Sequence, residues 1–253
     1  MLVDMLKQAT SLPAATIITG ACAFIVFDVI RRRSKAAFDF TSYPLGLHKD
    51  PPKPHHVLHL PVNSDPIGTF LSLLPAPSRT VTTTIKKQTP ARLRLHGVDK
   101  ITIGSTLSFR AHFSPLHSHQ GGGILSLPKS LMRYFVAWNM QGTIVTFHRG
   151  ASGPVAWAHI IRKGQALRLM WFYSNSTSKQ YNLWFASLTV ALFLASKEGL
   201  TIDLGPGGRT KATKEKFGFL ESVDWAKSYS GMYEACGGGF DAAREYLLGR
   251  RKS

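Results

Sequence analysis

The fold of this chain is decided by residues 199–219, which read GLTIDLGPGGRTKATKEKFGF. This stretch predicts a short buried strand, a glycine turn and a small basic helix that Gly218 closes. Thr201, Ile202 and Leu204 suit a pleated, buried segment. Pro206 has no backbone N–H and cannot continue a central ladder, so the strand is expected to end near Gly205.

Asp203 is the unexpected residue of that strand, because an isolated carboxylate among apolar neighbours needs a partner or a chemical task. Two interpretations stay open. In the first, Asp203 pairs with a nearby lysine or arginine. In the second, it belongs to a functional site, where perturbed carboxylates are common.

The segment before the strand, Tyr181–Glu198, predicts the strongest helix of the chain. Its residues are apolar nearly all round, which indicates a buried helix. Lys197 in the last turn and Gly199 after it are typical stop signals. The apolar part, Leu183–Ala195, is shorter than the about 20 residues that a membrane span needs, so we expect a core helix.

Composition indicates a globular, strongly basic protein. The 253 residues are 44% apolar and carry a net charge of +17, with a surplus of 8 basic groups in residues 31–95 and of 10 in residues 96–253. Such a surplus favours anionic partners, and a solvated basic surface is the equal alternative. With only Cys22 and Cys236, a disulfide scaffold is not indicated and a reducing compartment is the default.

Residues 1–33 are interpreted as an N-terminal membrane anchor. Leu12–Ile30 has Asp28 as its single charged residue, and it is just long enough to cross a hydrocarbon core of about 30 Å. Arg31–Arg33 follow at once, so the positive-inside rule puts the C-terminal side in the cytoplasm. The sequence therefore predicts a single-pass membrane protein, with an organelle-targeting segment as the alternative.

Residues 34–95 are predicted to be a largely disordered linker. Nine of the 14 prolines fall between Pro44 and Pro90, among lysines, histidines and hydroxyl residues. Such a segment buries too little apolar surface to offset its ordering entropy. His55, His56 and His59 stand among these prolines without carboxylate or cysteine companions, so we predict no metal site.

Residues 96–253 are predicted to form one α/β domain with a mixed sheet. Turn residues separate short apolar segments, as in an antiparallel meander that helices interrupt. The predicted strands are Val98–Ile103, Leu107–Phe113, Thr143–His148, Pro154–Arg162, Ala166–Tyr173, the strand ending at Gly205, and Ser222–Tyr229; besides the buried helix, the predicted helices are Pro128–Gln141, the basic helix and Asp241–Leu248.

This order of elements resembles the GNAT superfamily of acyl-CoA N-acyltransferases. Within it, the chain is most similar to the branch that joins Fem-type aminoacyl transferases with bacterial acyltransferases of polysaccharide and cell-envelope gene clusters. The resemblance covers Leu127–Tyr229, and the residues that carry it are Pro154-Val155-Ala156-Trp157, Trp171-Phe172-Tyr173-Ser174, Tyr181-Asn182-Leu183, Asp203-Leu204-Gly205-Pro206-Gly207 and Lys214 with Lys216-Phe217-Gly218-Phe219.

The resemblance implies a single GNAT-like domain with acyl-CoA (acetyl-CoA) as donor substrate and no metal. In this fold two neighbouring strands splay apart and hold the donor, whose pyrophosphate lies at the N-terminus of the following helix. A helix N-terminus is an anion site by its free N–H groups and its dipole. The implied donor-binding residues are Ser174, Ser176, Thr177, Ser178 and Lys179; the alternative is that the serines only cap the helix.

Acyl transfer to an amine needs a base, an oxyanion donor and an acid for the leaving group. The resemblance implies Asp203 as the residue that orients or deprotonates the acceptor, and Tyr173 as the residue that protonates the departing thiolate or binds the donor. Arg209, Lys211 and Lys214 are candidates for holding an anionic substrate group, and a solvated helix face explains these three residues equally well.

The leading hypothesis is therefore a membrane-tethered N-acyltransferase whose partners are an acyl donor, an amine-bearing acceptor and the membrane. One departure motivates a second hypothesis. The Gln/Arg-x-x-Gly-x-Gly phosphate loop of GNAT enzymes is absent before the helix, where residues 174–179 read SNSTSK. A binding or scaffold protein that kept the fold without the chemistry fits this departure. A basic nucleic-acid binder is the third hypothesis, and no recognition motif supports it.

Overall fold

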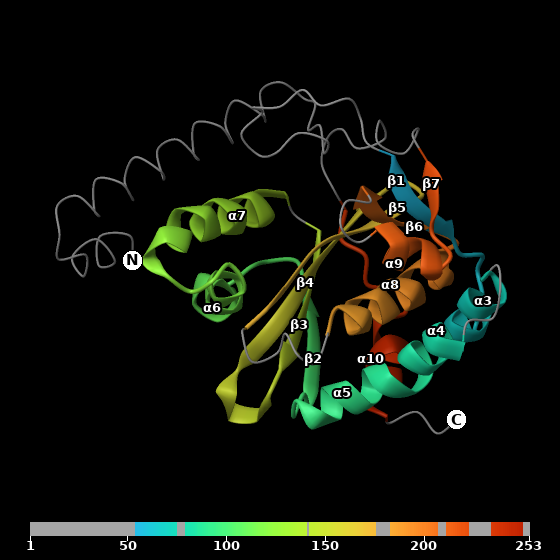
Figure 1. Ribbon diagram of the computed structural model, residues 1–253, viewed down its shortest axis with the longest axis horizontal. Coiled ribbons are helices and arrows are strands. Elements are labelled where there is room, and N and C mark those ends of the chain that lie inside the picture. The colour runs from blue at the N-terminus through green and yellow to red at the C-terminus, as the bar shows by residue number, and fades with distance from the viewer. Residues whose placement is uncertain are drawn as a thin grey trace.

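Seven strands form one mixed sheet in the computed structural model, in the order β2-β3-β4-β5-β6-β1-β7 (Figure 1). The structure describes residues 54–74, 79–140, 142–175, 183–206, 211–222 and 234–249. The strands are β1 His55–His59, β2 Lys100–Gly104, β3 Thr143–His148, β4 Pro154–Lys163, β5 Ala166–Ser174, β6 Thr201–Pro206 and β7 Leu220–Ser222; the helices are α3 Pro66–Ser72, α4 Arg79–Thr83, η1 Thr84–Gln88, α5 Thr89–Leu95, α6 Phe109–His119, η2 Ile124–Ser126, α7 Leu127–Met140, η3 Gly150–Ser152, α8 Trp184–Glu198, α9 Lys211–Lys216 and α10 Phe240–Leu248.

Strands β2 to β5 form an antiparallel meander, and β5 is joined to the parallel strand β6 by the crossover helix α8. A parallel connection needs such a crossover, because a tight hairpin can join only antiparallel strands. On the far side of β6, β1 and then β7 complete the sheet in antiparallel pairs. The predicted mixed α/β domain with a mixed sheet is thus confirmed.

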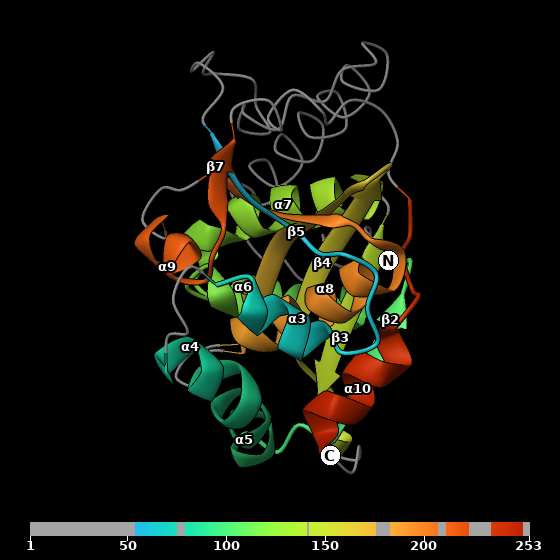
Figure 2. The same ribbon diagram turned by 90° about the vertical axis from the view of Figure 1, so that its right-hand side faces the viewer.

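Helices cover the two faces of the sheet unequally (Figure 1). Helix α8 packs on β5 and β6, and α3, α5 and α10 pack in turn against α8. Figure 2 looks onto this layer of helices. Helices α6 and α7 lie on the other face, where α6 contacts β4 and β5. The larger apolar core lies on the α8 side, and a second cluster around Trp157 and Tyr173 lies under α6 and α7.

Helix α8 is buried from Ala186 to Ser196 without interruption, as its apolar sequence predicts. Gly199 ends it in the left-handed conformation, with φ of 68°. A residue with a β-carbon is strained at this angle, so glycine is the natural stop. Tyr181 lies outside the described residues. Within those residues, no helix is long and apolar enough to cross a membrane.

The predicted strand Leu107–Phe113 is wrong, because α6 begins at Phe109. Its aromatic residues suggested a strand, but they recur at helical spacing. Phe109 stacks on Phe113 with ring centroids 4.6 Å apart, and Phe113 stacks on His117 at 5.6 Å. Residues four apart lie on one face of a helix. The tertiary packing of this aromatic face therefore overrides the local strand preference.

The predicted linker 34–95 is also wrong over its described part. Residues 55–59 form β1 inside the sheet, and four helical segments follow between Pro66 and Leu95. Leu60, Phe70 and Ile85 are fully buried in the main core. The prolines begin helices rather than prevent them: Pro66 and Pro90 stand at the first turns of α3 and α5, where their missing N–H groups cost nothing. The domain boundary predicted at residue 96 therefore cuts through folded structure.

The remaining predicted elements agree more closely. The last predicted strand, Ser222–Tyr229, appears as β7 at Leu220–Ser222, and residues 223–230 lie outside the described part. The predicted basic helix is α9, with Gly218 after it at a φ of 79°. The membrane anchor predicted for residues 1–33 also lies outside the described residues.

Candidate functional site

The candidate site is built around Asp203, which is fully buried on β6. Strand β1 pairs with β6 so that Val57 is opposite Asp203. This register brings Nδ1 of His55 to 2.7 Å from Oδ2 of Asp203. A carboxylate only accepts hydrogen bonds, so Nδ1 carries the proton and donates it. The partner of Asp203 that the sequence left open is thus a histidine, which comes from the segment predicted to be a linker.

The second oxygen of Asp203 fixes the turn that ends β6. Oδ1 accepts a hydrogen bond of 2.5 Å from the backbone N–H of Gly205. Gly205 has a φ of 72°, and a β-carbon there would lie only 3.0 Å from Nη2 of Arg168. Both the angle and this close approach require glycine. Arg168 itself is opposite Asp203 in the β5–β6 ladder and is almost fully buried.

Lys214 of α9 closes the site from the other side. Its ammonium donates to three backbone oxygens at the end of β6, those of Leu204 at 2.7 Å, Gly205 at 3.1 Å and Pro206 at 2.6 Å. Burial lowers the pKa of Lys214, Asp203 partly offsets this, and Arg168 adds a smaller lowering, so that the pKa is about 8. All three donors of Lys214, a predicted anion ligand, are thus engaged at the end of β6.

Lys211, another predicted substrate ligand, is engaged by carboxylates. Its Nζ lies 2.7 Å from Glu221 and 3.7 Å from Glu215. The hydrogen bond from Lys211 to Glu221 is the main reason that the pKa of Lys211 is raised. His56 lies beside the same two carboxylates. The third predicted substrate ligand, Arg209, lies outside the described residues.

Tyr173 is buried at the far end of β5, in the cluster under α6 and α7. Its ring lies 4.6 Å from that of Trp157 and meets the ring of His119 edge-on at 5.4 Å. Five residues separate Tyr173 from Arg168, which is opposite Asp203, and this corresponds to roughly 15 Å along an extended strand. Tyr173 and Asp203 therefore lie at separate points along the β5–β6 pair.

Strands β5 and β6 separate directly beyond the buried carboxylate. Their parallel ladder consists of Ala166–Thr201, Leu167–Ile202 and Arg168–Asp203. Both strands are fully described, and they continue to Ser174 and Pro206 without pairing to each other. This divergence is the feature that the sequence led us to expect at the donor site.

Of the predicted donor-binding residues, the structure describes Ser174 alone. It is buried at the end of β5, opposite Ala156 of β4. The others, Ser176, Thr177, Ser178 and Lys179, lie outside the described residues. Helix α8 begins after Leu183, which makes no side-chain capping bond, and its first turn contains no acidic residue.

His55 is the main residue of the site that sequence reasoning missed. The signal that could have found it is the short group of apolar residues Val57, Leu58 and Leu60 beside the histidines, which suits a short strand. The density of prolines outweighed that signal. No local pattern could have paired His55 with Asp203, because 148 positions separate them.

No protein-family model and no curated protein matches this sequence. Among solved structures, the chain is similar to the C-terminal domain (DUF2156) of a putative lysylphosphatidylglycerol synthetase from Agrobacterium fabrum. The two share 10% sequence identity at a TM-score of 0.37, and the match covers 78% of this chain. The chain spans less than two thirds of that protein, 64% of its length.

Proposed function

We propose that this protein is an acyltransferase that moves an acyl group from acyl-CoA, or a related donor, to an amine. The observation that carries the proposal is the parallel pair β5–β6, whose ladder ends at Arg168–Asp203 although both strands continue. An amide-bearing donor arm, such as pantetheine, can bind along strand backbone of this kind as an added strand would. The arrangement agrees with the GNAT resemblance of the sequence.

A β-bulge lies next to the point where the strands separate. Leu169 pairs with Ile160 and Trp171 pairs with His159, so Met170 between them has no opposite residue on β4. Bulges leave one residue outside the ladder and are frequent beside active sites. In the proposal, the backbone N–H of Met170 stabilises the negative oxygen that forms on the donor carbonyl.

The pair of His55 and Asp203 supplies the proton transfers. Because Nδ1 of His55 donates to Asp203, the basic nitrogen of the ring is Nε2. In the proposed step the acceptor ammonium first loses one proton to water; the neutral amine then attacks the thioester carbon while Nε2 takes the second proton from the attacking nitrogen. The carbon–nitrogen bond forms, the carbon–sulfur bond breaks, and the thiolate recovers the proton from His55. Asp203 is then a positioning residue, and Tyr173 belongs to the aromatic cluster under α6 and α7.

The test measures release of CoA thiol from acetyl-CoA and longer acyl-CoA donors by the full chain, with a panel of amines and mass detection of the product. His55→Gln and Asp203→Asn are expected to lower kcat by about 10² to 10⁴, the usual contribution of a general base. His59→Gln is the matched control, because His59 is an exposed residue of the same strand and should keep full activity.

Two outcomes would contradict the proposal. The first is that no acyl-CoA is bound or cleaved by the folded protein, which would favour the scaffold hypothesis. The second is that His55→Gln turns over at the normal rate, which would remove the pair from the chemistry.

The tether at residues 1–33 is part of the proposal on sequence grounds alone. The full chain should then sediment with membranes after a salt wash, and deletion of residues 1–33 should release it.

A further inference from the structure

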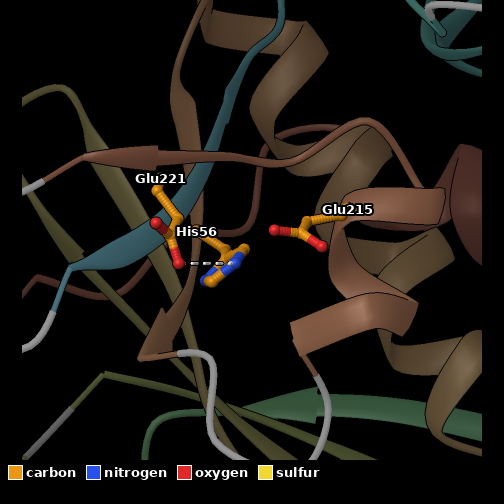
Figure 3. Close-up of side chains that lie close together, drawn as sticks. All are labelled: His56, Glu215 and Glu221. Carbon is orange, nitrogen blue, oxygen red and sulfur yellow. Dashed lines mark ion pairs between the residues drawn. The ribbon is translucent and has the colours of Figure 1, made fainter.

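A second group of chemically active side chains lies beside α9, separate from the Asp203 site. Strand β1 contributes His56, β7 contributes Glu221 directly opposite it, and α9 contributes Glu215 (Figure 3). One ligand atom from each residue, a ring nitrogen or a carboxylate oxygen, lies within 4.8 Å of the other two. Figure 3 shows the imidazole between the two carboxylates.

His56 is the informative member of this group. Its side chain is fully buried, yet neither ring nitrogen has a hydrogen-bond partner. The nearest carboxylate oxygen, on Glu221, is 3.8 Å from Nε2, which is beyond hydrogen-bond range. Burial lowers the pKa of His56, with Lys214 as a further cause. A buried polar group without a partner is costly, and such a group in a native protein commonly marks a bound ion or water.

The two carboxylates already hold a cation between them. The ammonium of Lys211 is 2.7 Å from Glu221 and 3.7 Å from Glu215. The hydrogen bond from Lys211 is the main cause of the lowered pKa of Glu221. Lys211 is half exposed, and its long stem can carry the ammonium out into water.

We propose that His56, Glu215 and Glu221 bind one divalent transition-metal ion, for which zinc is the best fit, in place of the Lys211 ammonium. A neutral imidazole and two carboxylates are a common ligand set for zinc, and they balance its charge. Ligand atoms around zinc lie about 3.3 Å apart, given bonds of 2.0–2.2 Å. The two glutamates are partly exposed, so they can close the distance from 4.8 Å.

The position of the site indicates what the metal would do. It would tie α9 to β1 and β7, and α9 also carries Lys214, whose ammonium binds the last carbonyls of β6. Zinc would therefore fix the end of β6 from the outer side of the sheet. Three protein ligands leave a fourth position for water. This inference does not depend on the proposed acyl transfer.

The experiment titrates zinc into the metal-free full chain and follows binding by calorimetry and by the increase in Tm. We expect one equivalent to bind, with affinity at least about tenfold lower in both His56→Gln and Glu221→Gln, since ligand and near-ligand losses cost 10- to 100-fold. Lys211→Met removes the competing ammonium and should tighten binding several-fold. Calcium should not displace zinc, because a histidine ligand disfavours hard cations.

Matched variants distinguish this site from zinc binding elsewhere on the surface. The chain contains 10 histidines, so His59→Gln on the same strand serves as the control and should leave the affinity unchanged. Glu221 and Lys211 are at the surface, and their variants keep the test valid if His56→Gln fails to fold. Equal affinity in the wild type and Glu221→Gln would overturn the site, and so would weaker binding in Lys211→Met.

Discussion

The layer between α8 and the sheet and the cluster around Asp203 are equally buried, but they are built from opposite kinds of residue. Leu188, Leu192 and their neighbours on α8 are enclosed by other apolar side chains. The other cluster buries four titratable side chains to a similar extent, those of His55, Arg168, Asp203 and Lys214. The comparison separates two tasks of a protein interior: apolar packing supplies stability, whereas buried polar groups need specific partners and supply chemistry.

The energetic terms of the two regions differ in sign. Burying apolar area is favourable at about 25 cal/mol per Å², whatever the detailed geometry. Burying a charge is unfavourable unless pairing and hydrogen bonds compensate it. In the polar cluster Asp203 has such partners in His55 and Gly205, and Lys214 has three carbonyls. Removal of a single partner should therefore do most harm there.

The largest loss in the free energy of unfolding is expected for Asp203→Ala. The substitution removes the carboxylate that accepts hydrogen bonds from His55 and from the N–H of Gly205. Loss of one partner from a buried pair lowers the free energy of unfolding by about 3–5 kcal/mol. Leu192→Ala on α8 should cost about 2–5 kcal/mol by leaving a cavity. Urea denaturation measures both free energies of unfolding.

A double-variant cycle then sharpens the contrast between the regions. Once Asp203 is gone, His55→Ala should change the free energy of unfolding by much less than it does alone, because the two residues act as a pair. Added to Leu192→Ala, His55→Ala should instead keep its full cost. Equal additivity in the two cases would show that the 2.7 Å contact between His55 and Asp203 contributes nothing measurable.

The part of the apolar region that α8 and the strands from β2 to β6 contribute was predictable from the sequence, and the reason is its continuity. The core helix, the four meander strands and the strand that stops at Pro206 are each signalled within a short stretch of residues. Gly199 and Gly205 mark ends that only glycine tolerates at their positive φ. Such signals are local, and the structure keeps them because local preference and tertiary packing agree here.

The polar region was only half predictable. Asp203 was visible as an anomaly on an apolar strand, but its partner His55 is brought in by a register between strands far apart in the chain. Lys214 looked like part of an exposed basic face, but it is buried against the backbone carbonyls at the end of β6. Sequence patterns report which residue is unusual. They do not indicate which distant strand will supply the hydrogen-bond partner of that residue.

Lys214 is expected to cause an intermediate change in the free energy of unfolding as pH rises. Its pKa is about 8 in the folded protein and 10.5 ordinarily, so between these values the unfolded chain binds more protons than the folded one. Stability therefore increases with pH across this window, and the gain is lost as pH falls back to 8. At about 1.4 kcal/mol per pH unit, the rise amounts to roughly 3 kcal/mol.

Unfolding of the wild type and Lys214→Met at pH 8, 9 and 10 measures that contribution. The slope should be smaller in Lys214→Met by this amount, while Lys216→Met, which changes an exposed lysine of the same helix, should keep the wild-type slope. Parallel curves for wild type and Lys214→Met would mean that the ammonium is not penalised by burial, because its three carbonyl partners compensate fully.

The smallest change in the free energy of unfolding is expected at an exposed ion pair, which tests whether distance or burial sets the strength of such a pair. Arg244 and Asp241 of α10 lie 3.1 Å apart, nearly as close as His55 and Asp203 at 2.7 Å, but Asp241 is exposed to water. Water screens such a pair, and pairs three residues apart on a helix are worth about 0.2–0.5 kcal/mol. Arg244→Gln should therefore lower the free energy of unfolding by no more than this, and 1 M NaCl, with a Debye length of about 3 Å, should shrink the difference further. A salt-independent loss above about 1 kcal/mol, the upper end for exposed pairs, would mean that proximity alone sets the strength of these pairs, and the contrast between the two regions would lose its physical basis.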